Sequence, residues 1–481
     1  MSSMPSTTAS TELPDHIRQR TSPAWLVTLL VCAGQFLVVL DVSVVNVALP
    51  AMRGGLGLSE LGLQWVVNAY VITFAGFMLL GGRAADIFGR KRIFVVGLVL
   101  FTVASLAGGL AQEAWQLVAA RTVQGVGAAV LSPASLTILT TSFPVGHART
   151  RAIATWTAVG AGGGAVGGLV GGVLTEYLSW RWVLLINVPV GALVLVGAAL
   201  WLTESRRNEV RRRLDIPGAL LVTAGLALVA YGIVQTESKG WTAPVALLPM
   251  AAGLVVIAAF VAVEARTRAP LMPLKLFRIR SVSSANAAMV LAGAAMFSMW
   301  YFLSLYMQNV LGYTPLQAGL SFIPHSLSIV IGSKIAPRLM HRIGAKNLAI
   351  AGALISAAGM IWQSRMSADG TYLTDILGPG ILMALGAGLM ATPVASLGTS
   401  GAEPSDQGLV SGLINTSRQM GGALGLSILS TVAASRIDSG GGKSAMAGGY
   451  GLAFGVGSLV LLCSVLMMVL TLPRHRDTTH T

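Results

Sequence analysis

One acidic residue, Asp41, stands inside a long apolar stretch that covers residues 24–50. In the hydrocarbon of a membrane a charged side chain costs roughly 2.5–3.5 kcal/mol on insertion scales, and such residues usually serve function. Asp41 is the only acidic residue that the sequence places well inside an apolar segment. We therefore expect it to hold a proton, to pair with a cation, or to do both.

A basic residue, Arg121, is embedded in a second apolar stretch, residues 117–133, with Gln124 on nearly the same helical face. An intramembrane arginine needs an interior position and a partner. One interpretation is that Arg121 modulates the proton affinity of a nearby carboxylate, because a cation favours the ionised form of an acid. Asp41 is the only embedded acid available. The other interpretation is a structural arginine that donates to backbone carbonyls, and the sequence alone does not say whether Arg121 reaches Asp41.

Other reactive chemistry is not indicated. The sequence has no G-x-x-x-x-G-K-[ST] phosphate loop, no H-E-x-x-H pair and no nucleophile elbow. Its two cysteines, Cys32 and Cys463, lie in apolar segments without the spacing of a metal site. We therefore predict no enzyme activity, no metal, no cofactor and no use of ATP by this chain.

Composition predicts the elements that must position these residues. Of 481 residues 54% are hydrophobic and 10% are charged, and mean hydropathy is +0.74, whereas soluble proteins carry about 25% charged residues. The chain is therefore expected to be an all-α integral membrane protein. Fourteen apolar segments are long enough to span a bilayer, near residues 24–48, 61–81, 93–112, 115–140, 151–175, 183–203, 214–236, 244–264, 283–310, 316–337, 346–364, 374–396, 407–433 and 449–472.

The net charge of +14 is best explained by membrane topology. Most of the 32 lysines and arginines fall on the side of the N-terminus, in clusters such as residues 89–92, 206–213 and 264–280. Cytoplasmic loops carry this excess of basic residues. We therefore predict that both termini are cytoplasmic, and we do not expect nucleic acid as a partner.

The order of segments predicts two halves around a short insertion. We expect a disordered cytoplasmic tail (1–22), a six-helix bundle (23–205), two linker helices with basic loops (206–280), a second six-helix bundle (281–473) and a cytoplasmic tail (474–481). Residues 151–174 and 408–429 are alike in glycine spacing. Internal repeats of this kind build secondary transporters, whose site lies near the midplane between the halves.

Two further motifs suggest conformational roles. In the loop at 81–94, Gly82, Asp86, Gly89 and Arg90 are spaced so that an acid and a base can latch one conformation. The alternative is a basic loop that only fixes topology, which does not explain Asp86 or Gly89. In residues 156–182, the glycines form a flat groove against which another helix can slide or seal. The alternative is generic packing of small residues. The glycines concerned are Gly164, Gly167, Gly168, Gly171 and Gly172.

Several polar or aromatic residues are candidates for a substrate cavity, although core or lipid-facing packing is an open alternative for each. Two interpretations are open for His325: it titrates near neutral pH, or it only caps a turn kinked by proline. The candidates are Gln64, Asn68, Gln124, Trp300, Tyr301, Gln308, His325 and Arg418.

These motifs together resemble a known family. The loop G-x-x-x-D-x-x-G-R-K-R at 82–92 resembles that of the major facilitator superfamily, and R-x-x-Q-G-x-G from Arg121 resembles its helix-4 motif. The glycine series resembles the antiporter motif of drug:proton exporters, with Gly164 and Gly168 where prolines are common. Residues 40–50, 180–191 and 414–425 are similar to the 14-helix drug:proton antiporter branch.

The resemblance implies a major facilitator fold with fourteen transmembrane helices arranged 6 + 2 + 6, as a monomer spanning the inner (cytoplasmic) membrane many times. It also implies a proton-coupled antiporter, in contact with lipid, that exports amphipathic, often cationic organic compounds such as drugs, dyes or antibiotics by alternating access. In this scheme Asp41 carries the proton, Arg121 tunes it, and the ionised carboxylate attracts a cationic substrate. Some relatives that export divalent cations carry an acid in the tenth helix; none stands there in this chain, which disfavours a dication.

Two alternatives remain open at this point. One is an uptake transporter, or one for lipids or siderophores, on the same fold; the glycine-rich segment disfavours it, whereas the missing prolines in that segment favour it. The other is a membrane scaffold or sensor that transports nothing. Such a protein would have no need for Asp41.

Overall fold

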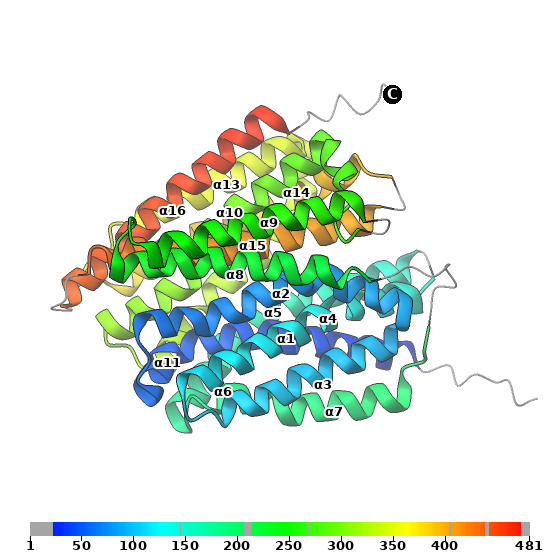
Figure 1. Cartoon of the computed structure of the whole chain (residues 1–481), viewed down its shortest axis with the longest axis horizontal. Helices are drawn as coiled ribbons and strands as arrows, with labels where there is room; N and C mark the ends of the chain where they lie inside the picture. The colour runs from blue at the N-terminus through cyan, green and yellow to red at the C-terminus, as the bar shows by residue number, and fades with distance from the viewer. Residues whose placement is uncertain are drawn as a thin grey trace, which may run out of the picture.

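The computed structural model describes residues 23–144, 146–205, 214–267, 270–403, 406–437 and 442–472. The tails predicted at 1–22 and 474–481 and the basic run at 206–213 lie outside these residues. Within the described ranges every regular element is a helix (Figure 1). The predicted all-α membrane architecture is confirmed.

The first group of helices contains α1 to α7. Its members pack on one another, with α4 lying against α1, α2 and α3, and α5 against α1. They are α1 (Ala24–Leu56), α2 (Glu60–Phe88), α3 (Arg90–Gly109), α4 (Ala114–Ser142), α5 (His147–Tyr177), α6 (Trp182–Leu185) and α7 (Asn187–Trp201).

Two helices, α8 (Ile216–Lys239) and α9 (Pro244–Arg266), pack on each other, and α8 also contacts α2 and α15. In Figure 1 this green pair crosses the middle of the view, where α8 runs next to α2.

The second group follows a short 3-10 helix, η2 (Leu274–Arg278). In this group α10 packs on α15 and α16, and α14 packs on α12 and α13. The group contains α10 (Arg280–Leu305), the π-turn η3 (Tyr306–Val310), α11 (Pro315–Ser321), α12 (Ile323–Ile343), α13 (Ala345–Gln363), the π-turn η4 (Leu373–Leu377), α14 (Gly378–Ser400), α15 (Gln407–Ala434) and α16 (Lys443–Thr471).

Thirteen helices in the described ranges are long and apolar enough to cross a membrane. Several join neighbouring elements, such as α6 with α7 and α11 with α12. The segment expected at 407–433 does form a helix, α15, but it is not among the thirteen. Polar side chains such as Asn415, Arg418 and Gln419 make it less apolar. The count of fourteen, the side of the termini and the domain boundaries stay predictions.

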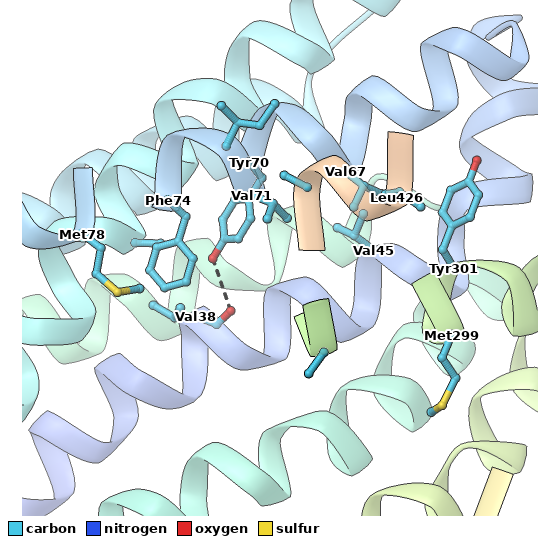
Figure 2. Close-up of a cluster of buried hydrophobic side chains, with 14 of the residues drawn as sticks. Val38, Val45, Val67, Tyr70, Val71, Phe74, Met78, Met299, Tyr301 and Leu426 are labelled. Carbon is cyan, nitrogen blue, oxygen red and sulfur yellow. Dashed lines mark hydrogen bonds between the residues drawn. The ribbon is translucent and has the colours of Figure 1, made fainter. Parts of the chain in front are cut away.

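The apolar core joins the two groups of helices. Val38 and Val45 of α1 and Phe74 of α2 belong to the same buried cluster as Met299 of α10 and Leu426 of α15 (Figure 2). Alternating access would therefore require the two groups of helices to move apart over part of this shared apolar surface.

Candidate functional site

Asp41 and Arg121, which are embedded in different helices, form an ion pair. The carboxylate Oδ2 of Asp41 on α1 accepts a hydrogen bond from Nη1 of Arg121 on α4 at 2.5 Å. The side chains are 0% and 2% exposed. The Nε of Arg121 also donates to the carbonyl of Val66 on α2 at 3.1 Å. The contacts that the two interpretations of the arginine require are therefore both present, since it pairs with the acid and donates to a backbone carbonyl, and its effect on proton affinity stays a prediction.

Amide side chains complete the shell around the carboxylate. Gln124 receives a bond on its Oε1 from Arg121 (2.8 Å) and donates through Nε2 to Oδ1 of Asp41 (2.6 Å). Asn187, the first residue of α7, donates to the same Oδ1 at 3.1 Å. Ser105 of α3 accepts from both amides, at 2.8 and 3.3 Å. Four helices of the first group therefore converge on one carboxylate.

Sequence reasoning missed Asn187 and Ser105. Both are fully buried, and Asn187 lies in the run WRWVLLINVPVG, where an amide in an apolar segment is itself a signal. Because a buried polar group must find a partner, a lone asparagine there predicts a polar contact, although not which one.

An aromatic ring fixes the guanidinium from a further direction. The Cζ of Arg121 lies 4.3 Å from the ring centroid of Tyr70 on α2, a cation–π geometry. The hydroxyl of Tyr70 in turn donates to the carbonyl of Val38 on α1 at 3.5 Å (Figure 2). The arginine is therefore held by a carboxylate, an amide, a carbonyl and a ring.

The pair is electrically neutral and closed to substrate. In low dielectric an ion pair persists only when its hydrogen bonds are well satisfied, and here both carboxylate oxygens have donors. The chemistry available is proton exchange: a proton on Asp41 would cancel its charge and weaken its bond to Arg121. The attraction of a cationic substrate by Asp41 stays a prediction, because the carboxylate is enclosed in this conformation.

The latch residues form a local cluster within the first group of helices. Asp86 and Arg90 make an ion pair at 3.3 Å, and Arg90 also donates to Ser205, which follows α7. The turn between α2 and α3 depends on Gly89, whose φ of 106° favours glycine. Gly82 faces Pro133 of α4 with ordinary contact distance. In the described ranges the side-chain hydrogen bonds of Arg90 therefore join the end of α2 to the segment that follows α7.

Glu204 also belongs to this cluster, although it lies outside the sequence motif. Its carboxylate accepts from the backbone N–H groups of Lys91 and Arg92, each at 3.2 Å. A negative side chain at a helix N-terminus satisfies free N–H groups and complements the helix dipole. A Cβ on Gly89 would overlap this carboxylate, so the glycine makes room for the cap.

The glycines of α5 pack on two different partners. Gly167 and Gly171 lie against Ser43 and Val44 of α1, within the first group. Gly168 and Gly172 lie against the backbone of α11 in the second group, at Gly319 and Leu316. Gly164 makes only ordinary contacts with side chains of α1 and α12. The groove therefore seals one group of helices against the other at this level.

Polar contacts close the same end of the molecule, which is the predicted extracellular end. Glu176, near the end of α5, accepts from the backbone N–H of Leu316 at 3.0 Å. Ser304 of α10 donates to the carbonyl of Asn46 at 2.7 Å, and Gln308 of η3 donates to that of Val47 at 2.9 Å. Nearer the start of α5, in contrast, a side chain at Gly160 or Gly162 would meet open space. The two groups of helices are therefore sealed at the end of α5 that contains Gly172 and Glu176.

We expect Gly172→Ala to lower the transport rate by about tenfold or more. Its Cβ would lie 2.7 Å from backbone atoms of Leu316 and Pro315, which cannot yield as a flexible side chain can, and overpacking of this kind costs typically 1–3 kcal/mol. The closed contact would then be disfavoured. Initial rates in vesicles, normalised to protein level, measure the effect, with Gly160→Ala as matched control. Equal rates for both variants would show that the contact is not needed.

The cavity candidates do not gather in one place. Gln124 belongs to the shell of Asp41, and Gln308 to the closed end. Asn68 donates to Ser427 across the α2–α15 contact at 2.9 Å. Gln64 and Tyr301 are buried in the core. Gln124, Gln308 and Asn68 therefore bridge helices in this conformation.

The remaining three candidates differ in exposure. Trp300 is half-buried, and its ring lies 4.9 Å from that of Phe322. His325 is fully buried. Arg418 is exposed, and its guanidinium donates to Asn415 on the same helix at 2.8 Å. Because Asn415 also approaches Met78 of α2, this stretch of α15 faces the first group of helices.

Metal binding finds no support in the described ranges, where no three histidine, cysteine or acidic side chains come together.

Comparison with known sequences identifies relatives over nearly the full chain. The Major Facilitator Superfamily profile matches residues 31–426. The chain is 50% identical over 457 residues to the cephamycin export protein CmcT of Amycolatopsis lactamdurans, covering 94% of this chain and 93% of that protein. It is 40% identical to the puromycin resistance protein pur8 of Streptomyces alboniger, covering 98% and 94%. It is 34% identical to the lincomycin resistance protein of Streptomyces lincolnensis, covering 95% and 93%.

Solved structures agree on the fold. A bacterial homologue of the lysosomal transporter Spinster, in an inward-facing and unoccupied conformation, superposes with a TM-score of 0.66 at 17% identity, over 93% of this chain and 96% of that one. A D-xylose–proton symporter superposes with a TM-score of 0.67 at 14% identity, over 95% and 99%. At these identities the likeness concerns the fold alone.

Proposed function

Because the chain belongs to the Major Facilitator Superfamily and is a multi-pass membrane transporter, we propose that it exports an amphipathic antibiotic across the cytoplasmic membrane in exchange for protons. The proposal includes a monomer surrounded by lipid as the working unit. Relatives that cover more than nine-tenths of the chain are named for antibiotic export or resistance, which supports drug efflux over uptake.

The observation that supports proton coupling is the enclosed Asp41–Arg121 pair. A neutral carboxylic acid is far cheaper to bury than a carboxylate, so proton binding at Asp41 changes the electrostatics between α1 and α4. Arg121 would then be free to re-pair or to shift, and α1 contacts the second group of helices through α10 and α11. Protonation at this site therefore acts on α1, a helix of the first group that also contacts the second group.

The substrate is proposed to meet Arg418 rather than Asp41 in this conformation. The guanidinium of Arg418 is exposed and has no carboxylate partner among the described residues. Such a side chain favours compounds with an anionic or hydrogen-bond-accepting group. The cationic substrates expected from the resemblance would instead need Asp41 to open towards them.

Direction of flux tests the proposal. Full-length protein is reconstituted in proteoliposomes with a cephamycin, puromycin or lincomycin, and a pH gradient of either sign is imposed. We expect the substrate to move in the direction opposite to the flow of protons, and to stop moving when an ionophore dissipates the proton gradient. Movement with the protons would establish uptake, and a lack of gradient-driven flux for any compound in a wider drug and dye panel would favour a scaffold or sensor.

A further inference from the structure

His325 lies in an unusual hydrogen-bonding environment. It is the third residue of α12 and is fully buried. Its Nδ1 lies 3.0 Å from the carbonyl oxygen of Ser321 at the end of α11, and its Nε2 lies 3.1 Å from the carbonyl oxygen of Ile376 in η4. Each ring nitrogen therefore faces an oxygen that only accepts hydrogen bonds.

The two carbonyl acceptors favour the protonated ring, whereas burial away from water favours the neutral one. A neutral imidazole has one N–H and one lone pair, whereas an imidazolium has two N–H groups. A neutral ring can satisfy only one of the two carbonyls, and its lone pair then faces the other. We propose that His325 is a second proton-binding site, in the second group of helices, in addition to Asp41. This inference rests on the proposed proton-driven export.

The pocket around the ring is built by the backbone of α14. Gly380 lies beside the imidazole, and a Cβ there would overlap the ring. Pro379 has no N–H, so the carbonyl of Asp375, four residues before it, lacks its usual helical donor. That carbonyl accepts a hydrogen bond from Gln363 of α13, and the carbonyl of the next residue, Ile376, faces His325. A π-turn at such a place is frequent at functional sites.

No carboxylate contacts the ring in the part of the chain that the structure describes. From η4, the carboxylate of Asp375 is engaged by the Tyr306 hydroxyl at 3.0 Å. From α5, Glu176 accepts from the backbone of Leu316. From α13, the amine of Lys346 donates to carbonyls at the end of α16. From α15, which packs on α14, the Arg418 guanidinium bonds Asn415.

Two aromatic rings also lie close to the imidazole. The centroids of Phe322 and Trp300 lie 5.9 and 6.5 Å from that of the imidazole. Stabilisation of the charged ring therefore comes from the two carbonyls, with the aromatic rings around it.

The position of the site links it to the closed end of the transporter. Ser321 is the last residue of α11, and the helix is interrupted at Phe322 before α12 begins. The same α11 supplies the backbone that seals against Gly168 and Gly172 of α5. A proton on His325 would tie α11 to η4 through both ring nitrogens. Loss of that proton removes one tie and loosens the segment that closes the molecule.

Histidine titration provides the direct test. Full-length protein with 15N-labelled histidine is placed in lipid nanodiscs, and His325→Gln identifies the signal by its loss. We expect a signal with both nitrogens protonated at acidic pH that loses one proton as the pH rises through about 5–8, the range in which histidine titrates. A His325 that remains one neutral tautomer throughout that range would overturn the proposal.

Transport stoichiometry provides the second test, with His341→Gln as a matched control at an exposed position on the same helix. In proteoliposomes we expect His325→Gln to lower the number of protons exchanged per substrate by about one, since one ring binds one proton, and His341→Gln to leave it unchanged. An unchanged ratio in His325→Gln would overturn the second site alone. Absence of proton-driven export in the wild type would overturn the proposed function itself.

A variant that keeps the histidine covers the case in which His325→Gln does not fold. Gly380→Ala places a methyl group in the space of the ring, and should shift or abolish the titration of His325 in the labelled protein. Gly408→Ala, where a Cβ meets open space, is its control. Identical titration in Gly380→Ala and the wild type would contradict the pocket described above.

Discussion

Asp41→Asn is expected to abolish proton-driven export, with a loss of about 100-fold or more. The amide has no proton to exchange, and it leaves the Arg121 guanidinium, 2% exposed, without its counter-charge. Removing one partner of a buried ion pair costs about 3–5 kcal/mol, and about 2.7 kcal/mol corresponds to a hundredfold shift in an equilibrium. The variant should therefore be trapped in part of its cycle as well as uncoupled from the gradient.

Counterflow separates these two effects. Exchange of labelled for unlabelled substrate across a membrane without a pH gradient does not need net proton movement. We expect Asp41→Asn to retain some exchange while losing gradient-driven accumulation. Asp369→Asn, the same chemical change in an exposed loop, should behave as wild type in both assays. Gradient-driven export by Asp41→Asn at the wild-type rate would show that the proton is carried elsewhere.

The sequence predicted which residues are embedded, because a charge in an apolar segment is visible without a structure. Asp41 and Arg121 were found in this way. Their pairing was not predictable, since 80 residues separate them along the chain and 146 separate Asp41 from Asn187. Helix packing decides such contacts, and no local pattern records it.

The fold was predicted more fully than the site, for a related physical reason. A transmembrane helix is recognised from its own residues, because each one must satisfy its backbone within itself. The α15 segment shows the limit of this argument: residues 407–433 were predicted to span and do form a helix, but its polar side chains keep it out of the thirteen helices that are apolar enough to cross a membrane. The two carbonyls at His325 also escaped prediction, because they depend on where α11 ends and on the π-turn that precedes α14.

Arg121→Gln is expected to lower the stability of the protein by about 3–5 kcal/mol, because it leaves the carboxylate of Asp41 buried without a cation. Transport should fall with it. Arg121→Lys should recover only part of either property. A lysine ammonium is a point charge, whereas the arginine bonds Asp41, Gln124 and Val66 at once and lies over the Tyr70 ring.

The double variant Asp41→Asn with Arg121→Gln decides whether the pair acts as a unit. Neither charge is then left unpaired, so we expect the double variant to be more stable than either single one, as measured by thermal unfolding in detergent. Such non-additivity is the signature of residues in direct contact. Arg365→Gln, at an exposed position, is the control for loss of an arginine and should leave stability unchanged.

Transport should not return in the double variant, whatever its stability, because no group at this place can then exchange a proton. Recovery of the fold without recovery of proton-driven export would separate the structural role of the pair from its role in coupling. Additive losses of stability would contradict the ion pair itself. Restored proton-driven export would contradict the assignment of the proton to Asp41, and another buried titratable group, such as His325, would then have to carry it.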